Sequence, residues 1–349
     1  MPRNSLSIIL AVFSIALAAC SSTVSTPTPL EEQGQESGLA YVEEFLSDPS
    51  DLSPVGLGGG EKLRVIATTN IVADVVGNIG GDTIELMALI PLGADPHTYQ
   101  PTPGDYRAMA DAHVIFISGL GLEEPMHGTL GQIAEEVSIV SLSEGIEPRQ
   151  IGVDEKPEPE SEGKASEYEG DLHPEGVDPH VWFDPFNVMI WAENTALALG
   201  ALDPPNADLY GDNALEFIET LEDLHLWIER EVAQLPDENR ELVTDHLTLG
   251  YFAQRYGFEM IGAVIPAYST AAEPSARELA SLEDAIIALD IKALFVGITV
   301  NPRIAERVAE DTGVVLVPLY SGSLSEPEAG TYLEFMKFNV DAIVEALGN

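Results

Sequence analysis

Residues 206–235 read NADLYGDNALEFIETLEDLHLWIEREVAQL. The apolar residues of this stretch recur at helical spacing over roughly 28 positions, which is unusually long for a helix of a globular protein. A helix of this length can run along a two-domain molecule and join its halves. The sequence on either side should then form two separate domains, and 349 residues are enough for two.

Short apolar runs alternate with helical segments on both sides of this helix. On the N-terminal side the alternation begins with KLRVIATT at residue 62 and ends with VSIVSLS at residues 137–143. On the C-terminal side it resumes with ELVTDH (241–246) and closes with the amphipathic TYLEFMKFNVDAIVEAL (331–347). Such alternation predicts parallel sheets covered by helices. The predicted fold is α/β, with two lobes of mostly parallel sheets joined by one long rigid helix.

The composition divides the chain further. We predict a tether over 20–60, an N-terminal lobe over 61–204, a linking helix over 205–236 and a C-terminal lobe over 237–349. The tether is predicted to be disordered because it is rich in Ser, Thr, Pro, Gly and Glu. Within the first lobe, residues 152–178 carry ten acidic residues against two lysines, with three prolines, and are predicted to form a mobile loop.

The N-terminus reads MPRNSLSIILAVFSIALAAC. Arg3 precedes an apolar run that is shorter than the roughly 20 residues of a membrane-spanning helix but typical of a secretory signal. The residues LAAC resemble the lipobox of bacterial lipoproteins. This resemblance implies a signal peptide over 1–19, a lipid on Cys20 and a protein outside the cytoplasm, anchored to the cell membrane. A plain signal peptide cut near Ala19 or Cys20 is the alternative.

The charge and cysteine content exclude several classes of protein. A net charge of −44 excludes a nucleic-acid binder that relies on phosphate contacts. The charge also exceeds what solubility requires, so adaptation to high salt and a generic acidic exported protein both remain open. A single cysteine excludes a disulfide within the chain and a metal site built on cysteines.

Three of the seven histidines stand in positions suited to a ligand site. His97 and His180 both lie in the tripeptide Asp-Pro-His, and His246 ends the predicted strand ELVTDH. His97 and His246 follow or end strands, which is where open α/β sheets place ligands. Several imidazoles suit zinc, copper, iron or nickel. Spacing alone leaves a metal site and ordinary polar loop histidines both open.

An aspartate closely precedes each of these histidines: Asp95, Asp178 and Asp245. A carboxylate beside a metal-binding histidine fixes its tautomer and raises its basicity. The proline before His97 and His180 restricts the backbone, so that less entropy is lost when a ligand binds.

Four segments resemble the cluster A-I solute-binding proteins, which serve zinc and manganese ABC importers: LGADPHTYQPTPGDYRAMADAHVIFISGLGLE, DPHVWFDP, TDHLTLGYFAQRYG and EPSARELASLEDAI. They follow the family's order from Lys62 to the C-terminus. The resemblance implies a metal in the cleft between the lobes, with His97, His180 and His246 as its ligands. It further implies a lipid-anchored binding protein, not an enzyme, that delivers Zn²⁺ to an ABC permease. We expect it to be a monomer.

The segment LYSGSLS at 319–325 departs from the family pattern, because Gly322 stands where many members have an aspartate that completes the site. The fourth coordination position of the metal, beside the three histidines, could be filled by water or by a carboxylate. Three imidazoles without a carboxylate favour Zn²⁺ over Mn²⁺, which prefers oxygen ligands and is the alternative. The candidate fourth ligands or outer-shell groups are Glu273, Glu326, Glu328, Asp95, Asp178 and Asp245.

Two other classes of protein are compatible with three converging histidines. Three histidines with a bound water also occur in zinc hydrolases. The chain has no His-Glu-x-x-His or Gly-x-Ser-x-Gly motif, and Glu273 is the only candidate base. A metal-binding adhesin is compatible with the same fold.

His173 in the acidic loop belongs either to a plain insertion or to a weak metal collector. Proton competition should weaken metal binding below about pH 6.5.

Overall fold

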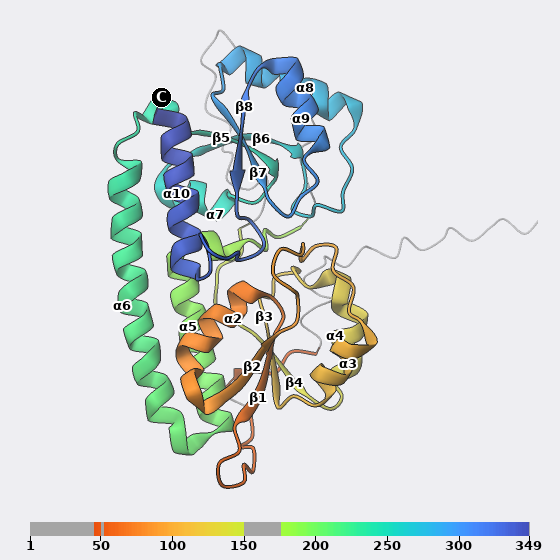
Figure 1. Cartoon of the computed structure of the whole chain (residues 1–349), viewed down its shortest axis with the longest axis vertical. Helices are drawn as coiled ribbons and strands as arrows, with labels where there is room; N and C mark the ends of the chain where they lie inside the picture. The colour runs from red at the N-terminus through yellow and green to blue at the C-terminus, as the bar shows by residue number, and fades with distance from the viewer. Residues whose placement is uncertain (1–44, 50–51, 150–175, 349) are drawn as a thin grey trace, which may run out of the picture. The chain divides into compact units, whose positions relative to one another are not determined.

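The computed structural model describes residues 45–49, 52–149 and 176–348. In this part of the chain, the strands form two four-stranded parallel sheets (Figure 1). The first sheet has the order β2-β1-β3-β4, with bounds β1 (Leu63–Ala67), β2 (Ile84–Ala88), β3 (Val114–Ile117) and β4 (Ser138–Ser141). The second has the order β6-β5-β7-β8, with bounds β5 (Glu241–His246), β6 (Glu259–Ile265), β7 (Ala293–Gly297) and β8 (Val315–Leu319). The predicted α/β class is confirmed.

Central and edge strands differ in burial as their sequences indicate. The inner strands β3 (VIFI) and β7 (ALFVG) are buried at every residue, because helices cover both faces of a parallel sheet. The edge strand β8 is only partly buried and contains Pro318, which lacks an amide hydrogen and is tolerated at a sheet edge.

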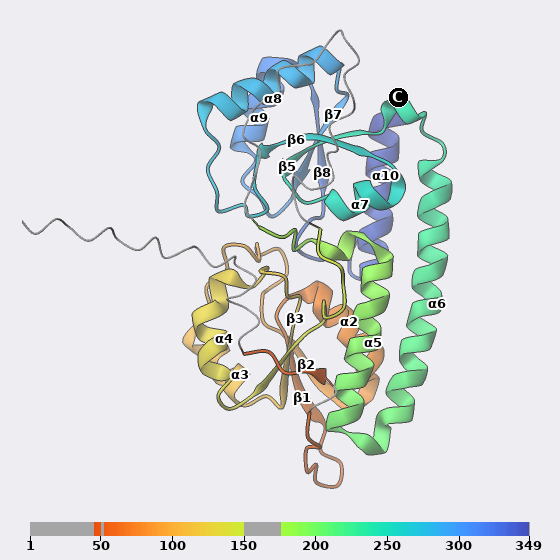
Figure 2. The same ribbon diagram turned by 180° about the vertical axis from the view of Figure 1, so that it is seen from behind.

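Helices cover both sheets (Figures 1 and 2). Their bounds are α2 (Asn70–Gly80), α3 (Pro103–Ala110), α4 (His127–Ile133), α5 (Pro185–Leu202), α6 (Ala207–Val232), α7 (Gly250–Tyr256), α8 (Ala276–Leu289), α9 (Arg303–Thr312) and α10 (Tyr332–Gly348). Short 3₁₀ turns are η2 (Gly81–Thr83), η3 (Glu124–Met126), η4 (Val181–Phe183), η5 (Pro204–Asn206) and η6 (Asp237–Asn239). No helix among the described residues is long and apolar enough to cross a membrane.

The long helix α6 runs beside both sheets (Figures 1 and 2). Its 26 residues span about 39 Å at 1.5 Å per residue. One stripe is buried and packs against α5 of the first lobe and α10 of the second. The stripe comprises Tyr210, Ala214, Phe217, Leu221, Leu224, Ile228 and Val232. The predicted link between two α/β lobes by one long helix is therefore present.

The two lobes share a hydrophobic core. One cluster of buried side chains includes Val72 and Trp191 from the first lobe and Phe295 and Phe335 from the second. Separate clusters fill the outer side of each sheet, beneath α3 and α4 in one lobe and beneath α8 and α9 in the other. The described residues accordingly belong to one compact unit, and the predicted domain boundaries within it stay predictions.

The predicted tether is too long at its C-terminal end. Phe45 and Leu46 pack against the core beneath α3 and α4, and the amide of Ser47 donates to the carbonyl of Ile139 over 2.7 Å. Apolar side chains within the Ser- and Pro-rich composition therefore attach this part to the first lobe. The predicted signal peptide, Cys20 and most of the acidic loop lie outside the described residues.

The exposed side of α6 is strongly acidic, which predicts that salt stabilises the protein. Like charges three or four residues apart repel one another along a helix, and salt screens them. The urea midpoint of unfolding should rise between about 0.1 M and about 1 M NaCl. The exposed ionisable residues are Asp208, Asp212, Glu216, Glu219, Glu222, Asp223, Glu229 and a single base, Arg230.

A charge-reduced control separates this repulsion from a general effect of salt. The triple variant Glu216→Gln, Glu219→Gln and Asp223→Asn should show a smaller rise in the urea midpoint than the wild type. An equal rise in both proteins, or none in the wild type, would contradict the interpretation.

Candidate metal centre

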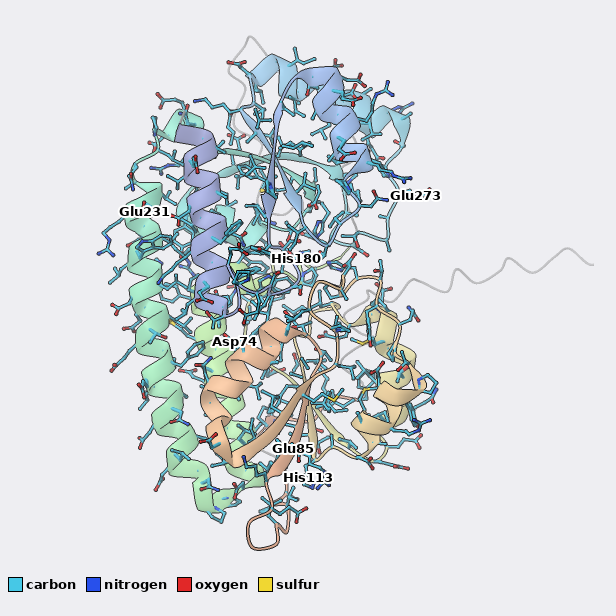
Figure 3. The ribbon with its side chains drawn as sticks, viewed as in Figure 1. Asp74, Glu85, His113, His180, Glu231 and Glu273 are labelled. Atoms are coloured by element: carbon cyan, nitrogen blue, oxygen red, sulfur yellow. The ribbon has the colours of Figure 1, made fainter. Side chains whose placement is uncertain are left out.

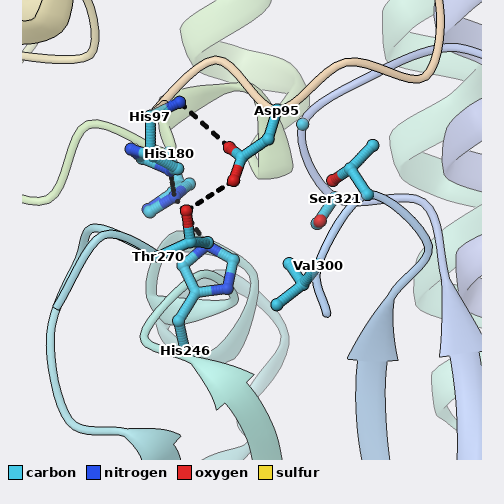
Figure 4. A pocket seen from close by; sticks show the side chains of 9 residues that line it. Asp95, His97, His180, His246, Thr270, Val300 and Ser321 are labelled. Carbon is cyan, nitrogen blue, oxygen red and sulfur yellow. Dashed lines mark hydrogen bonds between the residues drawn. The ribbon is translucent and has the colours of Figure 1, made fainter. Parts of the chain in front are cut away.

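Three imidazoles, from three separate segments of the chain, converge on one pocket (Figure 4). His97 lies in the loop after β2, His180 directly precedes η4, and His246 is the last residue of β5. All three are buried, with exposed fractions of 8%, 1% and 2%. Their ligand nitrogens all lie within 4.8 Å of one another. The structure therefore brings together the three histidines that the sequence singled out.

The spacing of the ring nitrogens matches a small tetrahedral ion. The Nε2 atom of His180 lies 3.1 Å from Nε2 of His97 and 3.3 Å from Nε2 of His246. A tetrahedral ion with metal–nitrogen distances of about 2.0–2.1 Å separates its ligand nitrogens by about 3.3–3.4 Å. The rings need little movement to take up such an ion.

The repeated Asp-Pro-His tripeptide forms the same local turn at both positions. The Oδ1 atom of Asp95 accepts the amide hydrogen of His97 over 2.9 Å, and Oδ1 of Asp178 accepts that of His180 over 3.0 Å. Aspartate commonly bonds the backbone two residues further on in this way, and proline restricts the backbone between them. The tripeptide is thus a rigid turn that presents a histidine.

Two of the imidazoles also bind a buried carboxylate through the nitrogen that faces away from the other rings. The Nδ1 atom of His180 lies 2.9 Å from Asp178 Oδ1, and that of His246 lies 2.8 Å from Asp245 Oδ1. When the carboxylate is ionised it only accepts hydrogen bonds, so that Nδ1 donates to it and Nε2 is the nitrogen left for a metal. The predicted outer-shell role fits Asp178 and Asp245 better than direct ligation.

Each of the three aspartates has a further partner on its second oxygen. Asp95 Oδ2 accepts from the Thr270 hydroxyl over 2.5 Å, and Asp245 Oδ2 accepts from the Gly297 amide over 2.8 Å. Asp178 Oδ2 lies 3.5 Å from Nη1 of Arg149. Sequence reasoning missed all three partners, because none carries a spacing signal that connects it to the histidines.

Burial keeps two of the imidazoles uncharged. It lowers the pKa of His97 and of His180 well below 6.5, and electrostatic interactions with neighbouring histidines lower both further. Burial also raises the pKa of Asp178 to about 7, against the lowering effects of the His180 amide and of Arg149. Near neutral pH, His97 and His180 therefore offer lone pairs for a metal without first losing a proton.

The glutamates considered as fourth ligands do not reach the pocket. Glu273 lies in an exposed loop before α8, Glu326 and Glu328 are exposed between β8 and α10, and none of the three lines the pocket. Asp95 is the carboxylate that lines the pocket (Figure 4). The other lining residues are the three histidines, Thr270, Thr299, Val300, Ser321 and Gly322.

Gly322 allows a close approach between the lobes. A Cβ atom at this position would lie 2.9 Å from Cδ and 3.1 Å from Cγ of Pro96, which belongs to the first Asp-Pro-His turn. The proline ring is part of the backbone and cannot swing aside as a flexible side chain does. A side chain at position 322 thus requires the loop that carries His97 to shift.

The other histidines that the structure describes do not line the pocket and contact other residues instead. His113 Nδ1 accepts from the amide of Arg64 over 3.0 Å, at the far end of the first sheet in Figure 3. His127 packs against Phe45, and His225 lies 3.2 Å from the hydroxyl of Tyr256. His173 lies outside the described residues.

A buried three-imidazole site between two α/β lobes joined by one helix defines a solute-binding protein of the metal-binding class. The family described as "Zinc-uptake complex component A periplasmic" matches residues 65–346. The chain belongs to this family, whose members are metal-binding substrate-binding proteins of ABC transporters.

Several named proteins are similar to this chain over more than four fifths of its length. A manganese-binding lipoprotein, MntA, of Halalkalibacterium halodurans is 33% identical over 291 residues, covering 82% of this chain and 89% of the relative. The manganese ABC transporter substrate-binding lipoprotein PsaA of Streptococcus pneumoniae is 30% identical over 298 residues, covering 82% and 90%. The structure of the periplasmic zinc-binding protein TroA of Treponema pallidum superposes with a TM-score of 0.71 at 28% identity, covering 83% and 100%.

The lowered histidine pKa values predict a pH dependence of stability in the metal-free protein. The unfolded chain takes up protons at these rings below about pH 6.5, whereas the folded protein does not. The stability that His97 and His180 contribute is therefore present above pH 6.5 and lost as the pH falls. From pH 6.5 to 5.5 each ring should lower the free energy of unfolding by about 1 kcal/mol.

Urea unfolding of the metal-free wild type and of a His97→Asn variant checks this effect. The difference between the proteins isolates His97, because the raised pKa values of Asp178 and Asp74 act in the opposite direction in both. The fall in unfolding free energy should be about 1 kcal/mol smaller in the variant. Identical pH dependence in both proteins would show that His97 titrates normally when folded.

Proposed function

We propose that this chain captures a divalent transition metal with His97, His180 and His246 and delivers it to an ABC import permease. The observation that carries the proposal is the convergence of three buried ring nitrogens, with Nε2 atoms 3.1 and 3.3 Å apart. Ordinary polar loop histidines, the other interpretation of the sequence, would not bring three buried ring nitrogens within 4.8 Å of one another. The family to which the chain belongs supports the same function.

The site is organised before a metal arrives. Buried aspartates orient His180 and His246, and the Asp-Pro-His turns fix the backbone beneath His97 and His180. Binding then costs little ordering entropy. The sequence alone suggested that protons compete with the metal once the pH falls below about 6.5. Because burial lowers the pKa of His97 and His180, we expect competition at these two rings to begin at a lower pH than that.

We propose Zn²⁺ as the preferred metal. The spacing of the ring nitrogens fits a tetrahedral ion, and the glutamates that could add oxygen ligands lie outside the pocket. Three imidazoles suit zinc, whereas manganese prefers oxygen ligands. Manganese is the second candidate, because MntA and PsaA are named for manganese and Asp95 offers an oxygen at the pocket wall.

We propose that the chain works outside the cytoplasm as a monomer, attached to the membrane through a lipid on Cys20. The lipobox-like LAAC sequence and the lipoprotein names of MntA and PsaA support the anchor. The partner that receives the metal is then the membrane permease of an ABC importer, as the name of PsaA indicates for that relative.

We propose that the protein does not use the metal for catalysis. A hydrolase needs a general base beside the metal-bound water. Glu273 is exposed outside the pocket, and Asp95 already accepts hydrogen bonds from the His97 amide and Thr270. Esterase and peptidase assays of the zinc-loaded protein should show no turnover; metal-dependent turnover would support a hydrolase over a transport protein.

A competition titration tests the three-histidine site. Purified metal-free protein should bind one equivalent of Zn²⁺, more tightly than Mn²⁺, against a chromophoric chelator. His97→Ala, His180→Ala and His246→Ala should each weaken zinc binding by more than about 100-fold, because losing a ligand exceeds the effect of losing an outer-shell partner. His113→Ala is the matched control and should bind like the wild type. Unchanged affinity in all three alanine variants would refute the site.

Substitutions at Gly322 test the fourth position. Gly322→Ala adds only the atom that meets Pro96, whereas Gly322→Asp adds the same atom and a carboxylate. Both should lower the unfolding free energy by about 1–3 kcal/mol through overpacking. Gly322→Asp should bind Mn²⁺ more tightly than Gly322→Ala, since manganese prefers oxygen ligands. Equal manganese affinity in the two variants would mean that a side chain at position 322 does not reach the ion.

A further inference from the structure

Arg149 forms an ion pair directly behind the metal centre. Its Nη1 atom lies 3.5 Å from Oδ2 of Asp178, whose side chain is completely buried, while the arginine side chain is 23% exposed. Asp178 in turn contacts His180 through both the amide and Nδ1. A cation at the edge of the protein is therefore connected to a ring of the metal centre by one carboxylate.

The second oxygen of Asp178 depends on this arginine. Oδ1 already accepts two hydrogen bonds from His180, at 3.0 and 2.9 Å, whereas Oδ2 has no hydrogen-bond donor among the described residues. Asp95 and Asp245 differ, because Thr270 and the Gly297 amide donate to their second oxygens. A buried carboxylate needs a partner for its charge, and Arg149 supplies one.

The backbone around this ion pair is fixed from several sides. The amide of Arg149 donates to the hydroxyl of Tyr251 over 2.9 Å, and that hydroxyl donates to the carbonyl of Asp178 over 3.1 Å. The amide of Asp178 donates to the carbonyl of Arg149 over 3.0 Å. The backbones of Arg149 and Asp178 are thus hydrogen-bonded to each other and to the same tyrosine, which holds the two residues side by side.

Gly250 makes room for the pair. A Cβ atom on this first residue of α7 would come closer than 3.0 Å to Nη1 of Arg149 and to Oδ2 of Asp178. The glycine does not have a positive φ angle, so its backbone conformation does not require glycine. The space above it is filled by the guanidinium and the carboxylate.

We propose that Arg149 is a positioning residue of the metal centre: its guanidinium, seated over Gly250, fixes the Asp178 carboxylate, which holds His180 with Nε2 directed at the metal. The predicted change in metal affinity rests on the proposed function, because it requires that the protein bind a metal. The orientation of the His180 ring, by contrast, can be measured in metal-free protein. Outer-shell partners of metal ligands typically change affinity by 10- to 100-fold, and Arg149 acts one contact further out.

Substitution of Arg149 provides the first test. Arg149→Met keeps much of the side-chain length but removes the charge, and should weaken zinc binding by about tenfold. Arg149→Lys should restore most of the affinity. In an Asp178→Asn background, Arg149→Met should have little further effect, because the contact through which it acts is already altered.

Substitution of Gly250 provides an independent test that leaves both charges in the chain. Gly250→Ala should push the guanidinium and the Asp178 carboxylate apart from their present positions and weaken zinc binding at least as much as Arg149→Met does. The matched control is Gly211→Ala in α6, where an added Cβ atom meets nothing within 4 Å. It should leave zinc affinity unchanged.

The nitrogen NMR signals of the His180 ring distinguish positioning from a general effect on folding. In the metal-free wild type they should show a single tautomer with hydrogen on Nδ1, and in Arg149→Met a mixture of tautomers. The proposal is overturned if Arg149→Met leaves both the affinity and these signals unchanged. It is also overturned if Arg149→Met weakens binding equally in the Asp178→Asn background. If the wild type bound no metal, the proposed function would fail, while the His180 signals would still test Arg149.

Discussion

The hydrogen bonds between buried imidazoles and buried carboxylates are the interaction on which the site depends. Burial alone would keep His97 and His180 uncharged but would leave each ring free to choose its tautomer. The aspartates behind His180 and His246 remove that freedom, because each accepts the hydrogen on Nδ1. The second oxygen of each aspartate also has a partner: Arg149 lies beside that of Asp178, and the Gly297 amide donates to that of Asp245.

The architecture keeps this arrangement in place from both sides. One hydrophobic cluster contains side chains of both lobes, and α6 packs against helices of each. A large hinge motion would expose that shared core to water. The loops carrying His97 and Thr270, one from each lobe, meet through the Asp95–Thr270 hydrogen bond.

The sequence predicted the fold from its apolar spacing, whereas the convergence of the three histidines was implied by the resemblance to the solute-binding family and was left open by their spacing alone. The stripe on α6 and the buried strands follow from apolar spacing, and the Asp-Pro-His repeats mark the turns. The surroundings of Asp178 could not be predicted, since Arg149 and Gly250 meet only through the tertiary fold. Gly322 was interpreted as a missing ligand, but Pro96 lies where its side chain would begin. The tether was overextended, because the apolar side chains of Phe45 and Leu46 lie within a polar composition.

X-ray absorption at the zinc edge, measured on protein loaded with one equivalent of Zn²⁺, tests whether the three histidines bind the metal. Three imidazole ligands should appear at about 2.0–2.1 Å, with at most one further light-atom ligand. Loss of one imidazole contribution in His97→Ala, His180→Ala and His246→Ala would assign each ring. A spectrum with fewer than three imidazoles in the wild type, or one dominated by oxygen ligands, would contradict a centre built on these three histidines.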